Sequence, residues 1–473
     1  MYGMSSVIKK NGIFQNIMYA FGAQGISMLL SILMSLFLPK ILGVREYSYW
    51  QLFIFYISYA GFFHLGENDG MYLKQGGKDY NQLDYSLLNT NLFLITLFQI
   101  IVMIVGCVIL SINDMADRNR VFVLVCTMIY MIIYNYSGYL SYVLQIANRI
   151  KEYSISVVIE KVLFLIAVVI GIITNNALFT IYIILNLAAK CIGLLYSIIK
   201  CKEVVFAKIC FSKEVIYDFF DNIKVGINLT FSSVAGMLVL GIGRNMIDTQ
   251  WGVETFGKFS LAISLSNFML QFISQISLVL FPALKRADEN KIINYYHKIQ
   301  DLLSFAILGV LLGYMPVYYL LSMWLPQYAE SLRYMVILLP ICVFDGKMNL
   351  LCNTYLKVLR KERQLLYFNL IALVVSFGLC SLGTYIFKNV FVVAVFMVVA
   401  VAIRSIISEV YLNHLLHVGL PVDIAVDCIM SLIFATGTWF TGAFKGFIIY
   451  IFAYLIMCAL FRRKIKELLE AAR

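Results

Sequence analysis

The residues of this chain that could do chemistry are the few ionisable side chains that interrupt long apolar stretches. Arg244 and Asp248 stand four positions apart, so both fall on one face of a helix. An arginine there can bind an anion such as phosphate, because its planar guanidinium group donates two hydrogen bonds at once. Asp248 would then limit how tightly the anion is held. The other interpretation is an ion pair that only neutralises itself.

Further charged side chains lie in other apolar stretches. Lys190 lies deep within one of them, where it either faces a cavity or packs against a neighbouring helix. Asp345 and Lys347 are too close in sequence to face each other on one helix, so we expect them to pair with neighbouring helices. Arg404 and Glu409 are likewise expected to be packing partners. Because an unpaired charge inside a bilayer is costly, each group is a candidate functional residue.

The histidines and the motifs of the sequence limit which kinds of catalytic or metal site are expected. His64 comes just before Glu67 and Asp69, where a proton or cation site is one interpretation and a solvated helix end is the other. His414 and His417 have no third ligand nearby, so no zinc site is expected. Nucleotide-binding loops and hydrolase motifs are absent from the sequence. We therefore expect no catalytic residues, no metal, no cofactor and no enzymatic activity.

The composition indicates which class of protein structure positions these residues. Hydrophobic residues make up 62% of the 473 residues, charged residues only 13%, and the mean hydropathy is +0.86. A soluble protein is roughly half apolar and a quarter charged, so an ordinary soluble enzyme is excluded. We predict an all-α integral membrane protein. The net charge of +11 is assigned to loops that face anionic lipid, not to nucleic-acid binding.

Apolar runs predict 14 membrane spans, since a bilayer core of about 30 Å takes roughly 20 residues of helix. The last two runs are close to the shortest length that spans a bilayer, so the expected number is 12 to 14. The predicted spans are 13–38, 47–66, 87–112, 121–147, 155–173, 177–199, 225–247, 257–283, 302–324, 334–356, 365–387, 390–412, 424–442 and 445–461.

Loop charges predict the orientation of these spans. With the N-terminus in the cytoplasm, 24 of the 37 Lys and Arg residues fall on the cytoplasmic side and 8 on the other side. Cytoplasmic loops of membrane proteins carry such an excess of Lys and Arg. The distribution therefore predicts an even number of spans with both termini in the cytoplasm.

Two sequence echoes predict an internal repeat. Residues 42–54 resemble residues 251–263, and residues 148–152 resemble residues 359–363 at nearly the same offset. Each echo falls at the same place within a unit of six spans, which predicts two six-helix lobes in the same orientation, related as a parallel repeat. The predicted parts are an N-lobe (1–200, spans 1–6), a cytoplasmic amphipathic linker (201–224), a C-lobe (225–415, spans 7–12), a C-terminal helix pair (416–461, spans 13–14) and a basic cytoplasmic tail (462–473).

Short motifs resemble a known family. The segment 37–47, with Pro39-Lys40-Ile41-Leu42-Gly43 at its centre, resembles the turn after the first span of Wzx-type polysaccharide flippases. These proteins belong to the MOP superfamily, together with lipid II flippases and MATE exporters. Residues 145–153 are similar to the family pattern after the fourth span. Gly257-Lys258-Phe259-Ser260, Phe281-Pro282 and the basic loop 357–363 also have counterparts in the family.

The resemblance implies a fold and a function. Spans 1, 2, 7 and 8 would line a cavity between the two lobes. The substrate would be an undecaprenyl-diphosphate-linked oligosaccharide, flipped from the cytoplasmic to the outer leaflet of the bacterial inner membrane by alternating access, for assembly of a surface polysaccharide such as O-antigen or capsule. Arg244 would be the best-placed cation, with other cations near the outer mouth. The expected substrate-binding residues are Arg244, Asp248, Lys258, Lys40, Arg45 and Lys190.

The same resemblance leaves H⁺ or Na⁺ as the coupling ion. Expected partners are membrane lipids, a polysaccharide polymerase and a chain-length regulator, and no nucleic acid. A MATE-like cation-coupled exporter of small amphiphiles is the alternative, although runs 11–39 and 85–113 lack the acidic residues such an exporter uses. A membrane glycan polymerase or acyltransferase is disfavoured because the predicted outer loops are short.

Overall fold

The structure is a computed structural model that describes residues 2–113, 116–174, 176–285, 289–418 and 422–462. Within these ranges the regular structure is entirely helical, which confirms the predicted all-α class. Of the predicted basic tail, 462–473, only Arg462 lies within the described residues. The chain divides into two compact units, Met1–Val234 and Ala235–Arg473, and the division falls inside one long helix. The predicted lobe, linker and tail boundaries remain predictions.

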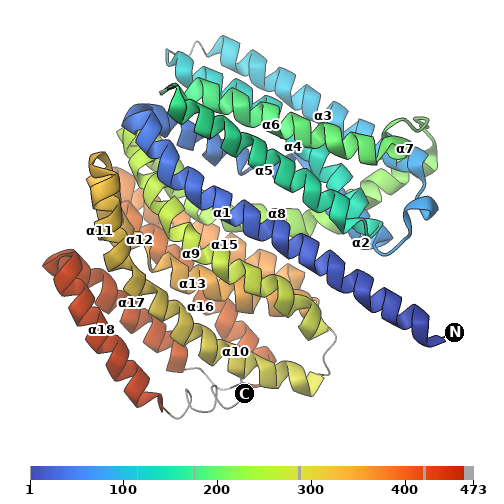
Figure 1. The fold of residues 1–473 in the computed structure, drawn as a ribbon. Helices are drawn as coiled ribbons and strands as arrows, with labels where there is room; N and C mark the ends of the chain where they lie inside the picture. Colours follow the sequence, from blue (N-terminus) through green and yellow to red (C-terminus); the bar gives the residue numbers. More distant parts are fainter. Residues whose placement is uncertain (1, 114–115, 175, 286–288, 419–421, 463–473) are drawn as a thin grey trace. The chain divides into compact units, whose positions relative to one another are not determined.

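The first unit is built from long helices joined by short turns. In chain order these are α1 (Tyr2–Ile57), η1 (Ala60–His64), α2 (Glu67–Gln75), η2 (Tyr80–Gln82), α3 (Tyr85–Ile112), α4 (Arg118–Ile146), α5 (Ile150–Ile173), α6 (Phe179–Lys200), α7 (Lys202–Val205) and α8 (Lys213–Trp251), of which residues 213–234 belong to this unit. Helix α5 lies between α1 and α6 (Figure 1).

Helix α1 changes direction at Gly43. The backbone of Gly43 has φ 68° and ψ 179°, a non-helical conformation that glycine adopts without steric cost. This kink separates the first predicted span, 13–38, from the second, 47–66. Beyond it, Trp50 stacks on Phe164 of α5 with ring centroids 5.4 Å apart. The aromatic contact fixes the second half of α1 against α5.

Helices α2 and α8 approach each other almost backbone to backbone. A Cβ atom on Gly70 would lie 1.9 Å from the carbonyl oxygen of Asn222, and one on Gly226 would lie 1.9 Å from the carbonyl oxygen of Gly66. Gly66 also has φ 87°, which favours glycine. Only residues without a side chain allow this contact, and it brings the polar side chains of α2 close to those of α8.

The second unit contains residues 235–251 of α8 and the helices that follow it. These are α9 (Val253–Lys285), α10 (Glu289–Val310), η3 (Leu311–Gly313), α11 (Tyr314–Trp324), η4 (Pro326–Tyr328), α12 (Ala329–Leu338), α13 (Ile341–Lys347), η5 (Met348–Cys352), α14 (Asn353–Val358), α15 (Glu362–Ser381), η6 (Leu382–Ile386), α16 (Val390–Leu415), α17 (Val422–Thr441) and α18 (Ala443–Leu460). Helices α17 and α18 form an antiparallel pair (Figure 1). The segments 326–338 and 341–358 meet at an angle of 49° beside Pro340.

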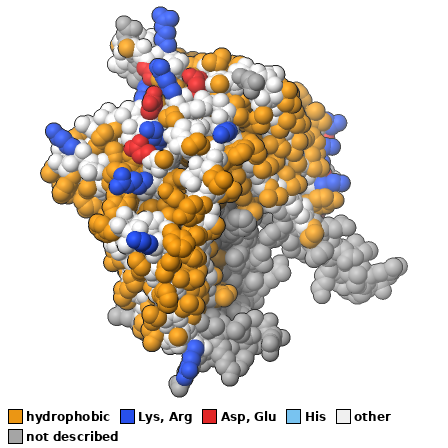
Figure 2. Space-filling model, turned by 60° about the vertical axis from the view of Figure 1, so that its left-hand side comes forward, with side chains coloured by type: hydrophobic (Ala, Val, Ile, Leu, Met, Phe, Trp, Pro, Cys, Tyr) orange, Lys and Arg blue, Asp and Glu red, His pale blue; other side chains and the backbone are white. Residues whose placement is uncertain are grey.

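Eleven helices among the described residues are long and apolar enough to cross a membrane, or up to 12 if the bent pair is one span. The predicted number of 14 therefore remains a prediction. One candidate, Gly22–His64, has 43 residues. A straight helix of that length measures roughly 65 Å, about twice the bilayer core, and the candidate overlaps both spans that the sequence predicts on either side of Gly43. On the face shown in Figure 2, hydrophobic side chains cover much of the described part of the molecule, as expected of helices in contact with lipid.

Candidate functional site

Arg244 is held against the following helix in the second unit. Its Nη2 donates a hydrogen bond to Ser260 Oγ at 3.0 Å, and its guanidinium carbon lies 5.2 Å from the ring centroid of Phe256. Both partners belong to α9, and Arg244 is half-buried while Asp248 is buried. A planar cation fixed by a hydroxyl group and an aromatic ring is well oriented. Its role as an anion ligand stays a prediction.

Three other predicted substrate-binding cations lie near the surface of their own units. Lys258 Nζ is 2.9 Å from Glu330 Oε2, an exposed ion pair between α9 and α12. Such pairs contribute roughly 0 to 1 kcal/mol. Lys40 and Arg45 are exposed on α1, on either side of Gly43, in the first unit. Exposure leaves both free of the desolvation cost that a buried cation meets.

Lys190 is neutralised inside the first unit. Its Nζ lies 2.6 Å from Glu160 Oε2, which joins α6 to α5. The ammonium group also lies 5.2 Å from the ring centroid of Tyr134 on α4. Sequence reasoning did not identify Glu160 as the partner, although it is an acid within a predicted apolar span. The pair accounts for the packing interpretation of Lys190, and a cavity role remains a prediction.

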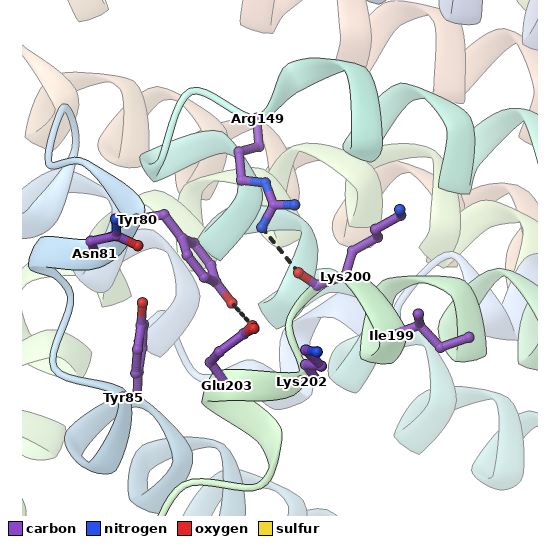
Figure 3. Close-up of a pocket in the computed structure, with 8 residues that line it drawn as sticks. All are labelled: Tyr80, Asn81, Tyr85, Arg149, Ile199, Lys200, Lys202 and Glu203. Carbon is purple, nitrogen blue, oxygen red and sulfur yellow. Dashed lines mark hydrogen bonds between the residues drawn. The ribbon is translucent and has the colours of Figure 1, made fainter.

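A polar pocket of about 330 Å³ lies where η2, α6 and α7 meet (Figure 3). The guanidinium carbon of Arg149 lies 4.8 Å from the ring centroid of Tyr80, and Arg149 Nη1 donates to the carbonyl oxygen of Lys200 at 3.0 Å. The Tyr80 hydroxyl donates to Glu203 Oε2 at 3.1 Å. The lining residues are Tyr80, Asn81, Tyr85, Arg149, Ile199, Lys200, Lys202 and Glu203.

The charges of this pocket suit an anion attached to a polar ring. Arg149, Lys200 and Lys202 supply cations, opposed by Glu203. A hydrogen bond from its own backbone and one from Tyr80 hold the pKa of the Glu203 carboxyl below its ordinary value. Burial, and then the neighbouring Cys201 and Glu203, raise the pKa of Tyr80, which keeps its hydroxyl a donor. Sequence reasoning used Arg149 in the loop charges, in an internal echo and in a family motif, and did not predict the pocket.

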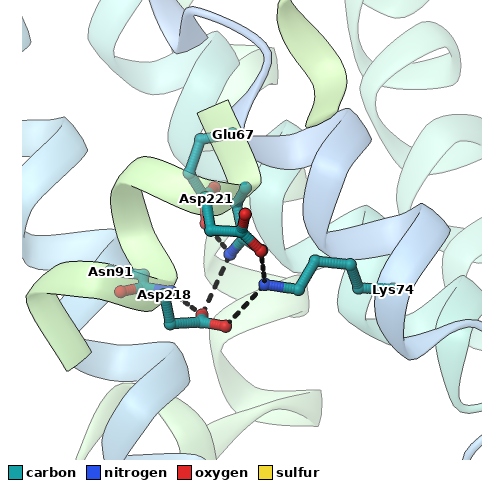
Figure 4. Close-up of polar contacts among 6 residues, drawn as sticks. Glu67, Lys74, Asn91, Asp218 and Asp221 are labelled. Carbon is teal, nitrogen blue, oxygen red and sulfur yellow. Dashed lines mark hydrogen bonds and ion pairs between the residues drawn. The ribbon is translucent and has the colours of Figure 1, made fainter. Parts of the chain in front are cut away.

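A second polar group, the α2–α8 junction, lies where the glycines bring α2 and α8 together (Figure 4). Lys74 Nζ lies 2.8 Å from Asp218 Oδ1 and 2.8 Å from Asp221 Oδ2. Asn91 of α3 donates to Asp218 Oδ2 at 3.2 Å. The junction ties three helices of the first unit together and balances one lysine against two carboxylates.

Glu67 is the most deeply buried acid of this junction. Its side chain is 0% exposed, and Asn222 Nδ2 donates to its Oε1 at 3.4 Å. Burial raises the pKa of the Glu67 carboxyl to about 8, so the group is mostly neutral at pH 7. Asp69 accepts hydrogen bonds from Tyr142 at 3.1 Å and from Thr230 at 2.9 Å. The expectation of a solvated helix end is therefore wrong for Glu67, because α8 covers it.

The expectation of ion pairs between helices is confirmed in the second unit. Arg404 of α16 pairs with Asp345 of α13, and Lys347 Nζ lies 3.3 Å from Glu409 Oε1. Asp345 and Lys347 each bind a partner on α16, as their spacing along the chain predicts. No group of three or more His, Cys, Asp or Glu residues that could hold a metal ion occurs among the described residues.

The family follows from a match in sequence. The model of the family described as "Polysaccharide biosynthesis protein" matches residues 13–288, which is more than half of the chain. The chain belongs to the polysaccharide biosynthesis protein family. No curated protein sequence matches this family member.

The fold of this polysaccharide biosynthesis protein is similar to the folds of solved membrane transporters. The lipid II flippase MurJ in an inward closed conformation has a TM-score of 0.66 and 12% identity, covering 96% of this chain and 100% of that chain. An inward-facing multidrug resistance MATE family transporter of the MOP superfamily has a TM-score of 0.62 and 13% identity, covering 84% of this chain and 94% of that chain. The resemblance drawn from the short motifs is confirmed for family and fold.

Proposed function

We propose that this protein is a flippase that moves an undecaprenyl-diphosphate-linked oligosaccharide from the cytoplasmic to the outer leaflet. The observation that carries the proposal is the match of residues 13–288 to a polysaccharide biosynthesis family. The fold shared with a lipid II flippase supports it, although at 12% identity that likeness concerns the fold alone. A chain of long apolar helices with few charged residues suits a transporter better than an enzyme.

The physical task is to carry a charged, hydrated headgroup across an apolar layer about 30 Å thick. A protein performs this task by offering polar groups along the path and by alternating access from the two sides. On this proposal Arg244 binds the diphosphate, because its guanidinium group is already oriented by Ser260 and Phe256. Lys40, Arg45 and Lys258 would act near the outer mouth, and H⁺ or Na⁺ would drive the cycle.

The pocket at Arg149 fits an earlier step of the same cycle. Arg149, Lys200 and Lys202 all lie on the side that the loop charges predict to be cytoplasmic. Cations next to tyrosine rings suit a phosphate group that carries a sugar. We infer that this pocket first captures the headgroup at the cytoplasmic surface of the inner membrane, where both termini would also lie.

A MATE-like exporter of small amphiphiles is the second candidate, favoured by the TM-score of 0.62 to a MATE family transporter. The two functions differ in the class of substrate. An exporter releases a soluble or amphiphilic compound, whereas a flippase leaves its substrate in the bilayer.

Leaflet transfer in proteoliposomes tests the proposal. Purified protein would be reconstituted with an undecaprenyl-diphosphate oligosaccharide, and exposure of the sugar to an impermeant lectin followed over time, with protein-free vesicles as the control. Protein-dependent exposure is the expected result. A folded protein that transfers nothing under an imposed H⁺ or Na⁺ gradient would contradict the flippase and favour the exporter.

A further inference from the structure

The second unit contains a buried group of charges that no step of the proposed function uses. We call it the ionic cluster, and it joins helices α13, α16 and α17. Its members are Asp345, Lys347, Arg404, Glu409, Asp423 and Asp427. None of the six is more than 8% exposed. Charges buried so fully must be balanced within the cluster or be neutralised.

Lys347 is the centre of the cluster. Its Nζ lies 3.3 Å from Glu409 Oε1 on α16 and forms a close ion pair with Asp427 Oδ2 on α17. Asp423, one turn before Asp427, also contributes to the electrostatic field at Lys347. The lysine therefore links three helices, and its single positive charge faces three carboxylates.

The cluster as a whole carries more acids than bases. Arg404 and Asp345 form a separate pair of one cation and one anion, and Arg404 Nη1 also donates to the carbonyl oxygen of Gly236 at 3.1 Å. Lys347 is then left with Glu409, Asp427 and Asp423. Glu409 and Asp427 both contact Lys347 directly, so these two carboxylates share one positive charge. An excess buried charge costs several kcal/mol, and a carboxylate in this situation takes up a proton instead.

The three carboxylates are not equally supported as anions. Glu409 Oε1 accepts a hydrogen bond from Gln300 Nε2 at 2.7 Å in addition to the contact with Lys347. Asp423 lies in the first turn of α17, where the helix dipole favours a negative charge. Asp427 lies a turn deeper, and Lys347 is the one cation that contacts it among the described residues.

The second oxygen of Asp427 identifies the place for a proton. Asp427 is 2% exposed, and its Oδ1 makes no hydrogen bond to any described atom of the protein. A buried carboxylate oxygen of an ionised group that accepts no hydrogen bond is strongly disfavoured. A proton on this carboxyl group leaves Lys347 balanced by the single charge of Glu409.

The other titratable groups near Asp427 do not replace this proton. Helix α18 contributes Tyr450, whose hydroxyl donates to the carbonyl oxygen of Leu308, and α17 itself contributes Cys428 next in sequence. Helix α10 contributes Gln300 to Glu409, and Tyr296 donates to Asn413. Helix α12 places Arg333 over Trp439, 12 residues and roughly 18 Å along α17 from Asp427.

We propose that Asp427 is a reversible proton-binding site, and, resting on the proposed function, that its proton is the one coupled to transport. When Asp427 is ionised, Lys347 holds α17 to α13 and α16. When Asp427 is protonated, Lys347 keeps its ion pair with Glu409 on α16, and its direct ion pair with α17 is lost, which weakens the contact of α17 with α13. The proton comes from water on one side and returns to water on the other, and the ionic cluster supplies two states of helix packing that differ by one charge.

Infrared difference spectroscopy of the purified protein tests the proton site independently of transport. The measurement follows the C=O stretch of protonated carboxyl groups as the pH is changed. It is made in a Glu67→Gln background, because Glu67 is also expected to be protonated. Asp427→Asn should remove a titrating component of this band. Glu160→Gln is the matched control, since Glu160 is an intramembrane acid balanced one to one by Lys190 and should leave the band unchanged.

A second variant keeps the test decisive if Asp427→Asn fails to fold. Asp427→Glu retains a titratable group and should keep the band at a shifted frequency and pH midpoint. A band that is identical in the parent protein and in whichever Asp427 variant folds would overturn the proposal.

The coupling is tested in the same proteoliposomes as the flippase. An imposed pH gradient should speed transfer by the parent protein, and transfer by Asp427→Asn should not respond to it. An equal response in both proteins would refute the coupling while leaving the proton site to the infrared result. If no protein transfers the lipid, the flippase proposal fails, and the infrared band still decides whether Asp427 binds a proton.

Discussion

The ammonium group of Lys190 on α6 lies 2.6 Å from the carboxylate of Glu160 on α5, and both side chains are largely shielded, at 12% and 14% exposed. The two helices are therefore joined by an ion pair inside a predicted membrane span. Removing one partner leaves the other charge in an apolar environment, whereas removing both leaves none.

We expect Lys190→Met to lower the free energy of unfolding by about 3 kcal/mol. Glu160→Gln should have a similar effect, and the double variant should recover most of the loss because no charge is left without a partner. Equilibrium unfolding in mixed detergent micelles measures all four proteins in one double-mutant cycle. If the two losses simply add, the ion pair does not stabilise the α5–α6 contact.

Glu67 makes the stability of the first unit depend on pH. Its carboxyl pKa is about 8 in the folded protein, against an ordinary value of 4.5, so the folded state binds more protons between these two values. The contribution of Glu67 to stability should therefore be greatest at low pH, fall as the pH rises from about 4.5 to 8, and change little above 8.

Thermal unfolding in detergent across this pH range measures the effect. Glu67→Gln mimics the neutral carboxyl group and should flatten the fall. Asp221→Asn, at the exposed edge of the same junction, should leave the fall in place. An identical pH dependence in the parent protein and in Glu67→Gln would show that Glu67 is already ionised in the folded state.

The sequence predicts the kind of structure well because membrane helices are encoded locally. Apolar runs identify helices such as α3 and α16 to within a few residues, and the motif around Gly43 marks the kink in α1. The pairing of Lys347 and Arg404 with neighbouring helices also follows from the cost of a buried charge.

The sequence does not predict which partners meet. Glu160 and Asp427 contact lysines on other helices, and spacing along the chain carries no information about such contacts. The burial of Glu67 was missed for the same reason, since it depends on Gly70 meeting the backbone of Asn222 more than 150 residues later. The number of spans remains a prediction because some helices, such as α1 with its kink at Gly43, include two predicted spans.

The α2–α8 contact should be sensitive to a single methyl group. In Gly70→Ala the new Cβ would lie 1.9 Å from the carbonyl oxygen of Asn222, so the helices must separate, at a cost of about 2 kcal/mol. Gly25→Ala in α1 is the control, because no atom lies within 4 Å of its added Cβ. Unfolding measurements in detergent should show a loss for Gly70→Ala alone. Equal stabilities would mean that α2 does not pack on α8 in this way.

The pocket at Arg149 should bind a diphosphate. Arg149→Gln removes the cation that lies over Tyr80 and should weaken binding of inorganic pyrophosphate by about tenfold, the effect of roughly 1.4 kcal/mol. Isothermal titration of the purified protein measures the affinity. Arg118→Gln, a cation outside the pocket, is the control. If both variants bind as the parent protein does, the pocket is not the anion site.

Arg244 should matter for transfer far more than Lys208, an exposed cation of the first unit. Its guanidinium group is fixed by Ser260 and Phe256, so Arg244→Ala removes an oriented ligand for the diphosphate and should slow leaflet transfer by at least tenfold. Lys208→Ala removes an exposed positive charge and should leave the rate within a factor of two. The lectin assay compares the variants at equal amounts of reconstituted protein.

Arg244→Lys separates charge from geometry, because lysine keeps the charge but cannot donate two parallel hydrogen bonds. A rate between those of the parent protein and Arg244→Ala is expected for it, and normal transfer by Arg244→Ala would remove Arg244 from the substrate path.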